Sequence, residues 1–118
     1  MAFKILGVDH IGVAVNDLDE TQNFWTAIGL PCTGQETVAT EPDSPIAKFI
    51  EKNGGRGGIQ HIALRVDDLP AAIAELQEKG IRMIDTKPRK GAGGADIAFV
   101  HPKSTFGVLL ELCQHEDR

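Results

Sequence analysis

Apolar and polar residues follow one pattern twice along this chain. Near the N-terminus they alternate in a run that predicts a strand over residues 5–15. Residues 9–18 of that run match residues 60–69 at an offset of 51, which aligns His10 with His61. Because a repeat usually reflects the architecture of a fold, we predict two copies of one unit, each with a strand that opens on a histidine.

The alternation also assigns faces to these two strands. In the first strand Ile11, Val13 and Val15 share one face, which we expect to be the core face, and the other carries His10, Gly12 and Ala14. A histidine beside such small residues suits a surface that another group approaches closely. The second strand repeats the division, with Ile62, Leu64 and Val66 opposite His61, Ala63 and Arg65. We therefore expect the two histidines to line a shared cleft.

Capping signals place a helix after each of these strands. Asp17, with Glu20 three residues later, can cap a helix that Gly29 ends. Asp68 and Gly80 play the same roles in the second copy, with a buried stripe of Leu69, Ile73 and Leu76. A further short helix is expected after Asp43, with Ser44 as its cap, Pro45 in its first turn, and an apolar face of Ile46, Phe49 and Ile50.

The second copy continues with three strand-like runs, at residues 81–85, 96–100 and 108–113. It therefore reads as strand-helix-strand-strand-strand, and the fold class is α+β. The first copy has only residues 31–43 for the corresponding part, which is room for one strand and a turn at ~5–6 residues per strand. We expect it to lack about two strands.

Composition narrows the class of protein. The 118 residues are 42% hydrophobic and 25% charged, with a formal net charge of -5, which argues against nucleic acid or a membrane surface as the main partner. No apolar run is long enough to span a bilayer. Cys32 and Cys113 are too few for a disulfide framework, and no secretory signal precedes the first strand. A cytoplasmic location is expected.

Several motifs carry a resemblance to a known family. They lie at residues 9–15, 43–49, 61–68, 91–94, 101–104 and 107–112, and include the helix motif Asp-Ser-Pro-Ile-Ala and the loop Gly-Ala-Gly-Gly. The chain resembles the vicinal oxygen chelate superfamily and, within it, the methylmalonyl-CoA epimerase family. The resemblance implies a single domain over residues 1–118, with repeat one at 5–42, a linker helix at 43–54 and repeat two at 59–114. The two repeats would form a cup-shaped mixed sheet.

The resemblance also implies a divalent metal ion in that cup. Three of the family's ligands carry over, as His10, His61 and Glu111. The fourth ligand and a second acid/base glutamate belong to the missing segment, whose gap falls near Ala39 and Thr40 with Glu36 and Glu41 on either side. Imidazole and carboxylate ligands suit Co, Mn, Ni, Zn or Mg, so the residues do not select one metal. Members of the superfamily commonly form homodimers.

The residues themselves support a buried role for Glu111. It lies in a run that is apolar on both faces, where a carboxylate is costly unless it is paired or binds a cation. The alternatives are a surface carboxylate on an edge strand for Glu111 and structural hydrogen bonding for His10 and His61. We interpret His101 and His115 as a turn and a tail residue. Cys32 and Cys113 are expected to be inert.

The glycine loop allows two interpretations. Glycines supply positive φ freely, so residues 91–94 can be a simple connector. Their backbone amides can also cradle a carboxylate or thioester oxygen, with Arg89, Lys90 or Lys103 near phosphates. The resemblance favours substrate contact through Gly91, Ala92, Gly93 and Lys103. Phe106 stands where the family usually has a smaller residue, which alters the rim of the cup.

The function implied by the resemblance is epimerisation of a methylmalonyl thioester of coenzyme A. Removing the proton between two carbonyls leaves an enolate that a cation stabilises, and inversion requires acid/base groups on both sides of the carbon. Glu111 is the candidate that remains for this role. Two alternatives stay open: a non-catalytic or impaired acyl-CoA-binding protein, because half of the site is missing, and an isomerase of the glyoxalase type.

Overall fold

The structure is a computed structural model that describes residues 2–33 and 45–116. It has two compact units, and each is described by itself: Met1–Gly12 with His61–Arg118, and Val13–Gln60. The elements, in chain order, are the strand β1 (Ile5–Ala14), the helices α1 (Leu18–Ala27) and α2 (Pro45–Lys52), the strand β2 (Gly58–Val66), the helix α3 (Leu69–Glu78), and the strands β3 (Arg89–Lys90), β4 (Asp96–Val100) and β5 (Leu110–Gln114).

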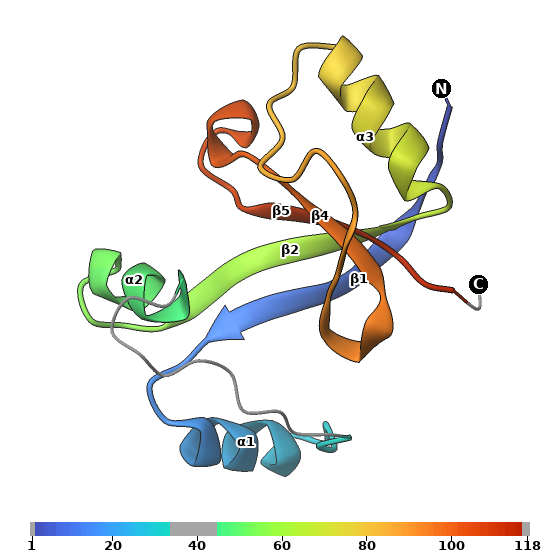
Figure 1. Ribbon diagram of the computed structural model, residues 1–118. Coiled ribbons are helices and arrows are strands. Elements are labelled where there is room, and N and C mark those ends of the chain that lie inside the picture. Colours follow the sequence, from blue (N-terminus) through green and yellow to red (C-terminus); the bar gives the residue numbers. More distant parts are fainter. Residues whose placement is uncertain (1, 34–44, 117–118) are drawn as a thin grey trace. The chain divides into compact units, whose positions relative to one another are not determined.

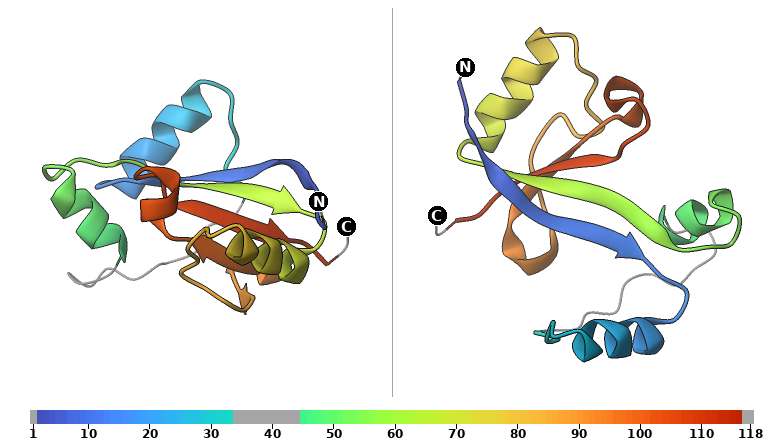
Figure 2. Two further views of the ribbon diagram at one scale, coloured as in Figure 1. Left: turned by 90° about the horizontal axis from the view of Figure 1, so that it is seen from above. Right: turned by 180° about the vertical axis from the view of Figure 1, so that it is seen from behind.

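The strands form one mixed sheet with the order β1-β2-β5-β4-β3 (Figures 1 and 2). β2 runs parallel to β5, with Ala63 opposite Glu111, and β4 is antiparallel to both β5 and β3. The parallel pair needs a crossover, and α3 provides it. The α+β class expected from the sequence is therefore confirmed, with the sheet built mainly from the second copy.

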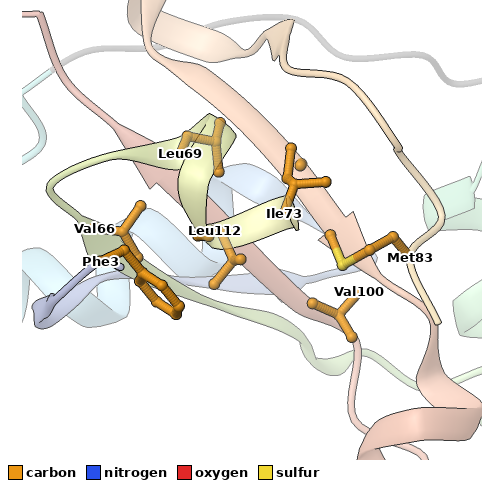
Figure 3. Close-up of a cluster of buried hydrophobic side chains, with 9 residues drawn as sticks. Phe3, Val66, Leu69, Ile73, Met83, Val100 and Leu112 are labelled. Atoms are coloured by element: carbon orange, nitrogen blue, oxygen red, sulfur yellow. The ribbon is translucent and has the colours of Figure 1, made fainter. Parts of the chain in front are cut away.

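The core of the larger unit lies between α3 and the sheet. α3 packs over β4 and β5 (Figure 1). Figure 3 shows the cluster of buried side chains between them, which are Phe3, Val66, Leu69, Ile73, Met83, Val100 and Leu112. Leu76 packs against this cluster from the same helix, so the apolar stripe predicted for α3 is confirmed. These contacts hold β2 and β5 in register, and both strands carry residues of the candidate site.

The predicted caps are present on both repeated helices. The Asp17 carboxylate accepts a hydrogen bond from the Glu20 amide at 3.0 Å, and Asp68 accepts one from the Ala71 amide at 3.1 Å. Gly29 and Gly80 follow the two helices with positive φ, as a helix C-terminus favours. The Ser44 cap expected for α2 lies outside the described residues.

The smaller unit ties the end of β1 to the turn before β2. The Asn16 side chain donates to the Gly55 carbonyl at 3.0 Å, and Asn53 donates to the Gly57 carbonyl at 3.1 Å. A Cβ at Gly57 would overlap the Ala14 carbonyl oxygen, so this approach requires glycine. Residues 53–57, which are rich in glycine and precede β2, thus form a hydrogen-bonded turn.

The strand predicted over residues 81–85 is wrong. That segment makes only an isolated bridge, between Met83 and Val100. The Asp85 carboxylate accepts a hydrogen bond from the Phe99 backbone amide at 2.9 Å. In a regular antiparallel ladder a backbone carbonyl would accept that hydrogen bond. The chain then forms the short strand β3 directly before the glycine loop at residues 91–94. The other two predictions hold, since β4 matches residues 96–100 and β5 begins two residues later than expected.

The core face assigned to β1 is also wrong. Ile11 and Val13 are 53% and 48% exposed, whereas Ala14, from the opposite face, is buried. β1 is the terminal strand of the sheet, and no strand among the described residues pairs with its outer edge. Residues 28–33, which follow α1, hold no strand either. Within the described residues, the apolar side chains of Ile11 and Val13 are therefore about half exposed and do not form a core face.

None of the helices in the described parts of the chain has the length and apolar character needed to cross a bilayer.

Candidate active site

Three predicted ligands meet on neighbouring strands of the sheet. His10 lies on β1, His61 on β2 and Glu111 on β5. The Glu111 Oε1 atom is 3.2 Å from His61 Nε2 and 3.5 Å from His10 Nε2, and the two Nε2 atoms are 3.3 Å apart. The structure thus brings the two repeated histidines together, as the offset of 51 residues predicted.

Gly12 makes room for the His61 ring. A Cβ built on Gly12 would lie 2.8 Å from His61 Nε2 and closer still to its Cε1 and Nδ1 atoms. Carbon and nitrogen atoms without a bond between them do not approach so closely, so a side chain at position 12 would displace the ring. Gly12, on the histidine face of β1, therefore permits the close approach that the sequence predicted.

Glu111 is buried between these imidazoles. Only 5% of the residue is exposed, so the interpretation as a surface carboxylate on an edge strand is wrong. Burial lowers the pKa of His61, an effect that the His10 charge reinforces and the Glu111 charge opposes. His61 is therefore held in its neutral form near pH 7, the form in which imidazole binds a metal.

The donor set fits a divalent cation. Three ligand atoms that each lie ~2.1 Å from one metal ion are roughly 3.0–3.5 Å from each other, and the three observed separations are 3.2, 3.3 and 3.5 Å. Two imidazoles and a carboxylate on one side of a metal leave its other positions open for small ligands. The three residues can hold a metal that still has positions for substrate oxygens.

A second group of side chains lies behind His10. Asp9 Oδ2 is 2.7 Å from His10 Nδ1, and Asp9 Oδ1 is 2.8 Å from His115 Nε2. The interpretation of His115 as a tail residue is wrong, because it is partly buried against this carboxylate. Burial raises the pKa of Asp9, but hydrogen bonds from His10, His115 and Cys113 outweigh it, so the pKa is below its usual value.

Cys113 faces the same carboxylate from β5. Burial and the neighbouring Asp9 charge raise the pKa of the thiol to about 12, so it remains protonated and unreactive. Asp9, His10 and Cys113 also form a second group whose ligand atoms lie within 4.8 Å of one another. Asp9 could have been found from its place directly before the repeated histidine, whereas no local pattern pointed to His115.

Phe99 and Arg89 border the site on the side of β4. The Phe99 ring packs edge-on to His61, with centroids 5.9 Å apart, and the Arg89 guanidinium lies 5.4 Å from the Phe99 centroid. Asp85 holds Arg89 through a 3.0 Å ion pair. His61 thus lies against an aromatic ring that itself contacts a cation.

The residues predicted to contact substrate lie at the two ends of β4. Ala92 and Gly93 belong to a 3₁₀ turn before β4, which Gly91 directly precedes, whereas Lys103 lies in a second turn after β4, at Pro102–Thr105. The structure does not bring the glycine loop and Lys103 together. Gly93 and Gly94 have positive φ, so the loop needs glycine as a connector. His101 caps the second turn, as its interpretation as a turn residue implies.

Phe106 follows that second turn and is 97% exposed, with a positive φ of 60°. A large side chain in the left-handed region is uncommon. The ring of Phe106 is therefore almost fully accessible to solvent.

Comparison with known proteins identifies the relatives of this chain. Residues 34–99 match the family model of the glyoxalase/bleomycin resistance protein/dioxygenase superfamily. The ethylmalonyl-CoA/methylmalonyl-CoA epimerase of Cereibacter sphaeroides is 47% identical over 130 residues, with 91% of this chain and 96% of that protein covered. The mitochondrial methylmalonyl-CoA epimerase of Homo sapiens is 34% identical over 129 residues, covering 91% and 73%.

The length of the alignment can be compared with the number of residues that the first repeat is expected to lack. The alignment with the Cereibacter protein has 130 positions, yet 91% of a 118-residue chain is only about 107 residues, so about 23 positions lie opposite gaps in this chain. Two strands and their turns need a segment of this size at ~5–6 residues per strand. The number of gapped positions is therefore about the size of the segment that the first repeat is expected to lack.

Solved structures agree with the sequence relatives. A variant of Streptomyces coelicolor methylmalonyl-CoA epimerase in complex with 2-nitronate-propionyl-CoA superposes with a TM-score of 0.88 at 31% identity, covering 96% of each chain. The methylmalonyl-CoA epimerase of Mycobacterium tuberculosis gives 0.86 at 31% identity, covering 93% of this chain and 88% of the other. The chain belongs to the glyoxalase/bleomycin resistance protein/dioxygenase superfamily and, within it, to the methylmalonyl-CoA epimerase family.

Proposed function

We propose that this chain interconverts the (2R) and (2S) epimers of methylmalonyl-CoA in the cytoplasm by proton abstraction at C2. The observation that carries the proposal is the convergence of His10, His61 and Glu111, with Glu111 buried between the two imidazoles. Its relatives support the reaction class, since those named above are methylmalonyl-CoA or ethylmalonyl-CoA/methylmalonyl-CoA epimerases.

We infer that His10, His61 and Glu111 hold a divalent cation, one of Co, Mn, Ni, Zn or Mg. A bound cation would polarise the thioester and carboxylate oxygens of the substrate and stabilise the enolate charge. Burial favours the neutral form of His61, which is the form in which imidazole binds a metal. Because these ligand types suit several divalent ions, the bound metal is to be identified by titrating metal-free protein with each cation.

Glu111 also has the role of acid/base group in this proposal. A carboxylate can take the C2 proton, and burial keeps water from competing for the same position. The substrate would extend from this point past Gly91, Ala92 and Gly93 on one side or Lys103 on the other. The ammonium of Lys103 is exposed and suits a phosphate of coenzyme A.

We further propose that residues 1–118 act as a single domain, with repeats at 5–42 and 59–114 joined by a linker helix at 43–54, and that two copies form a homodimer. β1 supports the dimer because it ends the sheet and exposes Leu6, Val8 and Ile11. A long apolar edge strand is a template for pairing with another chain. Light scattering should give twice the monomer mass, and a monomer at micromolar concentration would contradict the dimer.

The test of the proposed function uses protein stripped of metal with a chelator and then reloaded with each cation in turn. The substrate is one pure epimer of methylmalonyl-CoA, and the readout is the appearance of the other by chiral chromatography. We expect turnover that needs the cation and is lost in Glu111→Gln. Turnover that persists after chelation, or that survives in Glu111→Gln, would contradict the assignment of the site.

A second candidate function is acyl-CoA binding without turnover. The observation that favours it is the gap of about 23 positions relative to the Cereibacter epimerase, because inversion needs a second acid/base group. Within the described residues, Glu111 is the one carboxylate of the His10–His61 ligand group. This candidate predicts that the protein binds methylmalonyl-CoA in calorimetry and converts none of it with any cation.

A further inference from the structure

The carboxylate of Asp9 is engaged on both of its oxygen atoms. Oδ2 lies 2.7 Å from His10 Nδ1 and Oδ1 lies 2.8 Å from His115 Nε2. The Asp9 side chain is mostly buried, and that of His115 is about one third exposed. Neither residue has a part in the proposed reaction, so the purpose of this arrangement is open.

The geometry fixes the direction of these hydrogen bonds. An ionised carboxylate can only accept, so His10 Nδ1 and His115 Nε2 must both carry protons and donate to Asp9. A neutral imidazole has a single N–H, which means that the Nε2 atom of His10 is left with a lone pair. That atom is the one that faces His61 and Glu111, at 3.3 and 3.5 Å.

We propose that Asp9, held in place by His115, is a positioning residue that keeps His10 in its Nδ1–H tautomer and directs the Nε2 lone pair at the ligand cluster. The opposite tautomer would aim an N–H at the position of the cation. Partners of this kind behind a ligating histidine orient the ring and raise its basicity. The consequence for metal binding rests on the proposed function, but the tautomer of His10 does not.

A competing arrangement uses some of the same residues. Asp9, His10 and Cys113 also present ligand atoms within 4.8 Å of one another. A cation there would take His10 through Nδ1 and would have to break the hydrogen bonds from His10 and His115 to Asp9. The buried site on the other side of His10 needs no such rearrangement, because its three ligand atoms face one another already.

The first experiment measures the tautomer in the metal-free protein. Long-range ¹H–¹⁵N correlation spectra at about pH 8, where an ordinary histidine is neutral, distinguish the Nδ1–H from the Nε2–H form. We expect the Nδ1–H form for His10 in the wild type and a shift toward Nε2–H in Asp9→Ala. An Nε2–H form in the wild type, or an unchanged tautomer in Asp9→Ala, would overturn the proposal.

The second experiment measures cation affinity by competition with a chromophoric chelator, using Co²⁺ and Zn²⁺. Asp9→Ala should weaken binding by about 10- to 100-fold, the usual loss when such a partner is removed. Asp19→Ala, which removes an exposed carboxylate on α1, is the matched control and should bind as the wild type does. Equal affinities for Asp9→Ala and the wild type would overturn the proposal.

His115 is tested with two substitutions in the same assay. His115→Gln keeps an N–H donor for Asp9 and should stay within about twofold of the wild type, whereas His115→Ala should weaken binding severalfold. Equal binding by all three proteins would remove His115 from the proposal. A sulfur-to-cobalt charge-transfer band in the Co²⁺ spectrum would instead place the cation at Cys113 and overturn the proposal. If the wild type binds no cation, the proposed function fails while the tautomer result still stands.

Discussion

The close approach of His61 to Gly12 makes Gly12→Ala a sharp test of the site. A Cβ at position 12 would lie 2.8 Å from His61 Nε2 and nearer to two other ring atoms. Because favourable heavy-atom contacts begin at ~3.5 Å, the ring must move by roughly 1 Å or more. His61 Nε2 is now 3.2 Å from Glu111 Oε1, and a metal site accepts deviations of only ~0.2 Å in its ligand distances.

The expected effect is large on function and modest on stability. A misplacement of this size costs about 100-fold in catalysis, and we expect cation affinity to fall at least about 10-fold in parallel. His61 is only partly buried, so its ring can swing toward solvent, and the free energy of unfolding should fall by no more than about 1–3 kcal/mol. Chelator competition, the epimerisation assay and thermal melting measure the three quantities.

Two controls separate the displacement of His61 from a general effect of the methyl group. Gly58→Ala makes the same chemical change on β2, where the nearest atom would be 3.5 Å from the new Cβ, and it should behave as the wild type does. In a His61→Ala background the substitution at Gly12 should cost nothing further, because the ring it displaces is gone. An undiminished cost in that background, or normal cation affinity in Gly12→Ala, would refute the reasoning.

Three further predictions concern single groups of the site. Glu111→Gln should lower cation affinity by at least about 100-fold with a melting temperature within a few degrees of the wild type; normal affinity would exclude Glu111 as a ligand. Only the exposed Cys32 should react with a thiol reagent at about pH 8, since the pKa of Cys113 is raised to about 12, and both should react after unfolding. Burial lowers the pKa of His61 below that of an unfolded histidine, so the unfolded state binds more protons and the metal-free protein should lose stability as pH falls below ~6.5. His61→Ala should not show this loss of stability below pH ~6.5. The same dependence of stability on pH in His61→Ala and in the wild type would contradict the assignment to His61.

Local signals in the sequence predicted most of the second repeat. Asp68 and Gly80 bound a helix because caps act within a few residues, and the apolar stripe of α3 needs only its own periodicity. The repeat brought His10 and His61 together because equivalent strands of two copies occupy equivalent positions. The burial of Glu111 was predicted because the residues around it are apolar on both faces of the strand. That prediction does not require knowledge of which side chains contact Glu111.

The errors arose where structure depends on distant residues. Alternation predicts that β1 has one core face, but which face is buried depends on the strands beside it, and among the described residues β1 ends the sheet. Residues 81–85 have the apolar character of a strand, yet the Asp85 side chain takes the place of a ladder carbonyl. His115 is near the end of the chain and 106 residues from Asp9, so no local pattern could reveal their pairing.

The most direct test of the account incubates the cation-loaded protein with one epimer of methylmalonyl-CoA in D₂O. Mass spectrometry follows deuterium at C2 while chiral chromatography follows inversion in the same samples. The account predicts that deuterium enters and the other epimer appears together, both dependent on the cation and on Glu111. Binding with neither exchange nor inversion, or exchange without inversion, would contradict an epimerase.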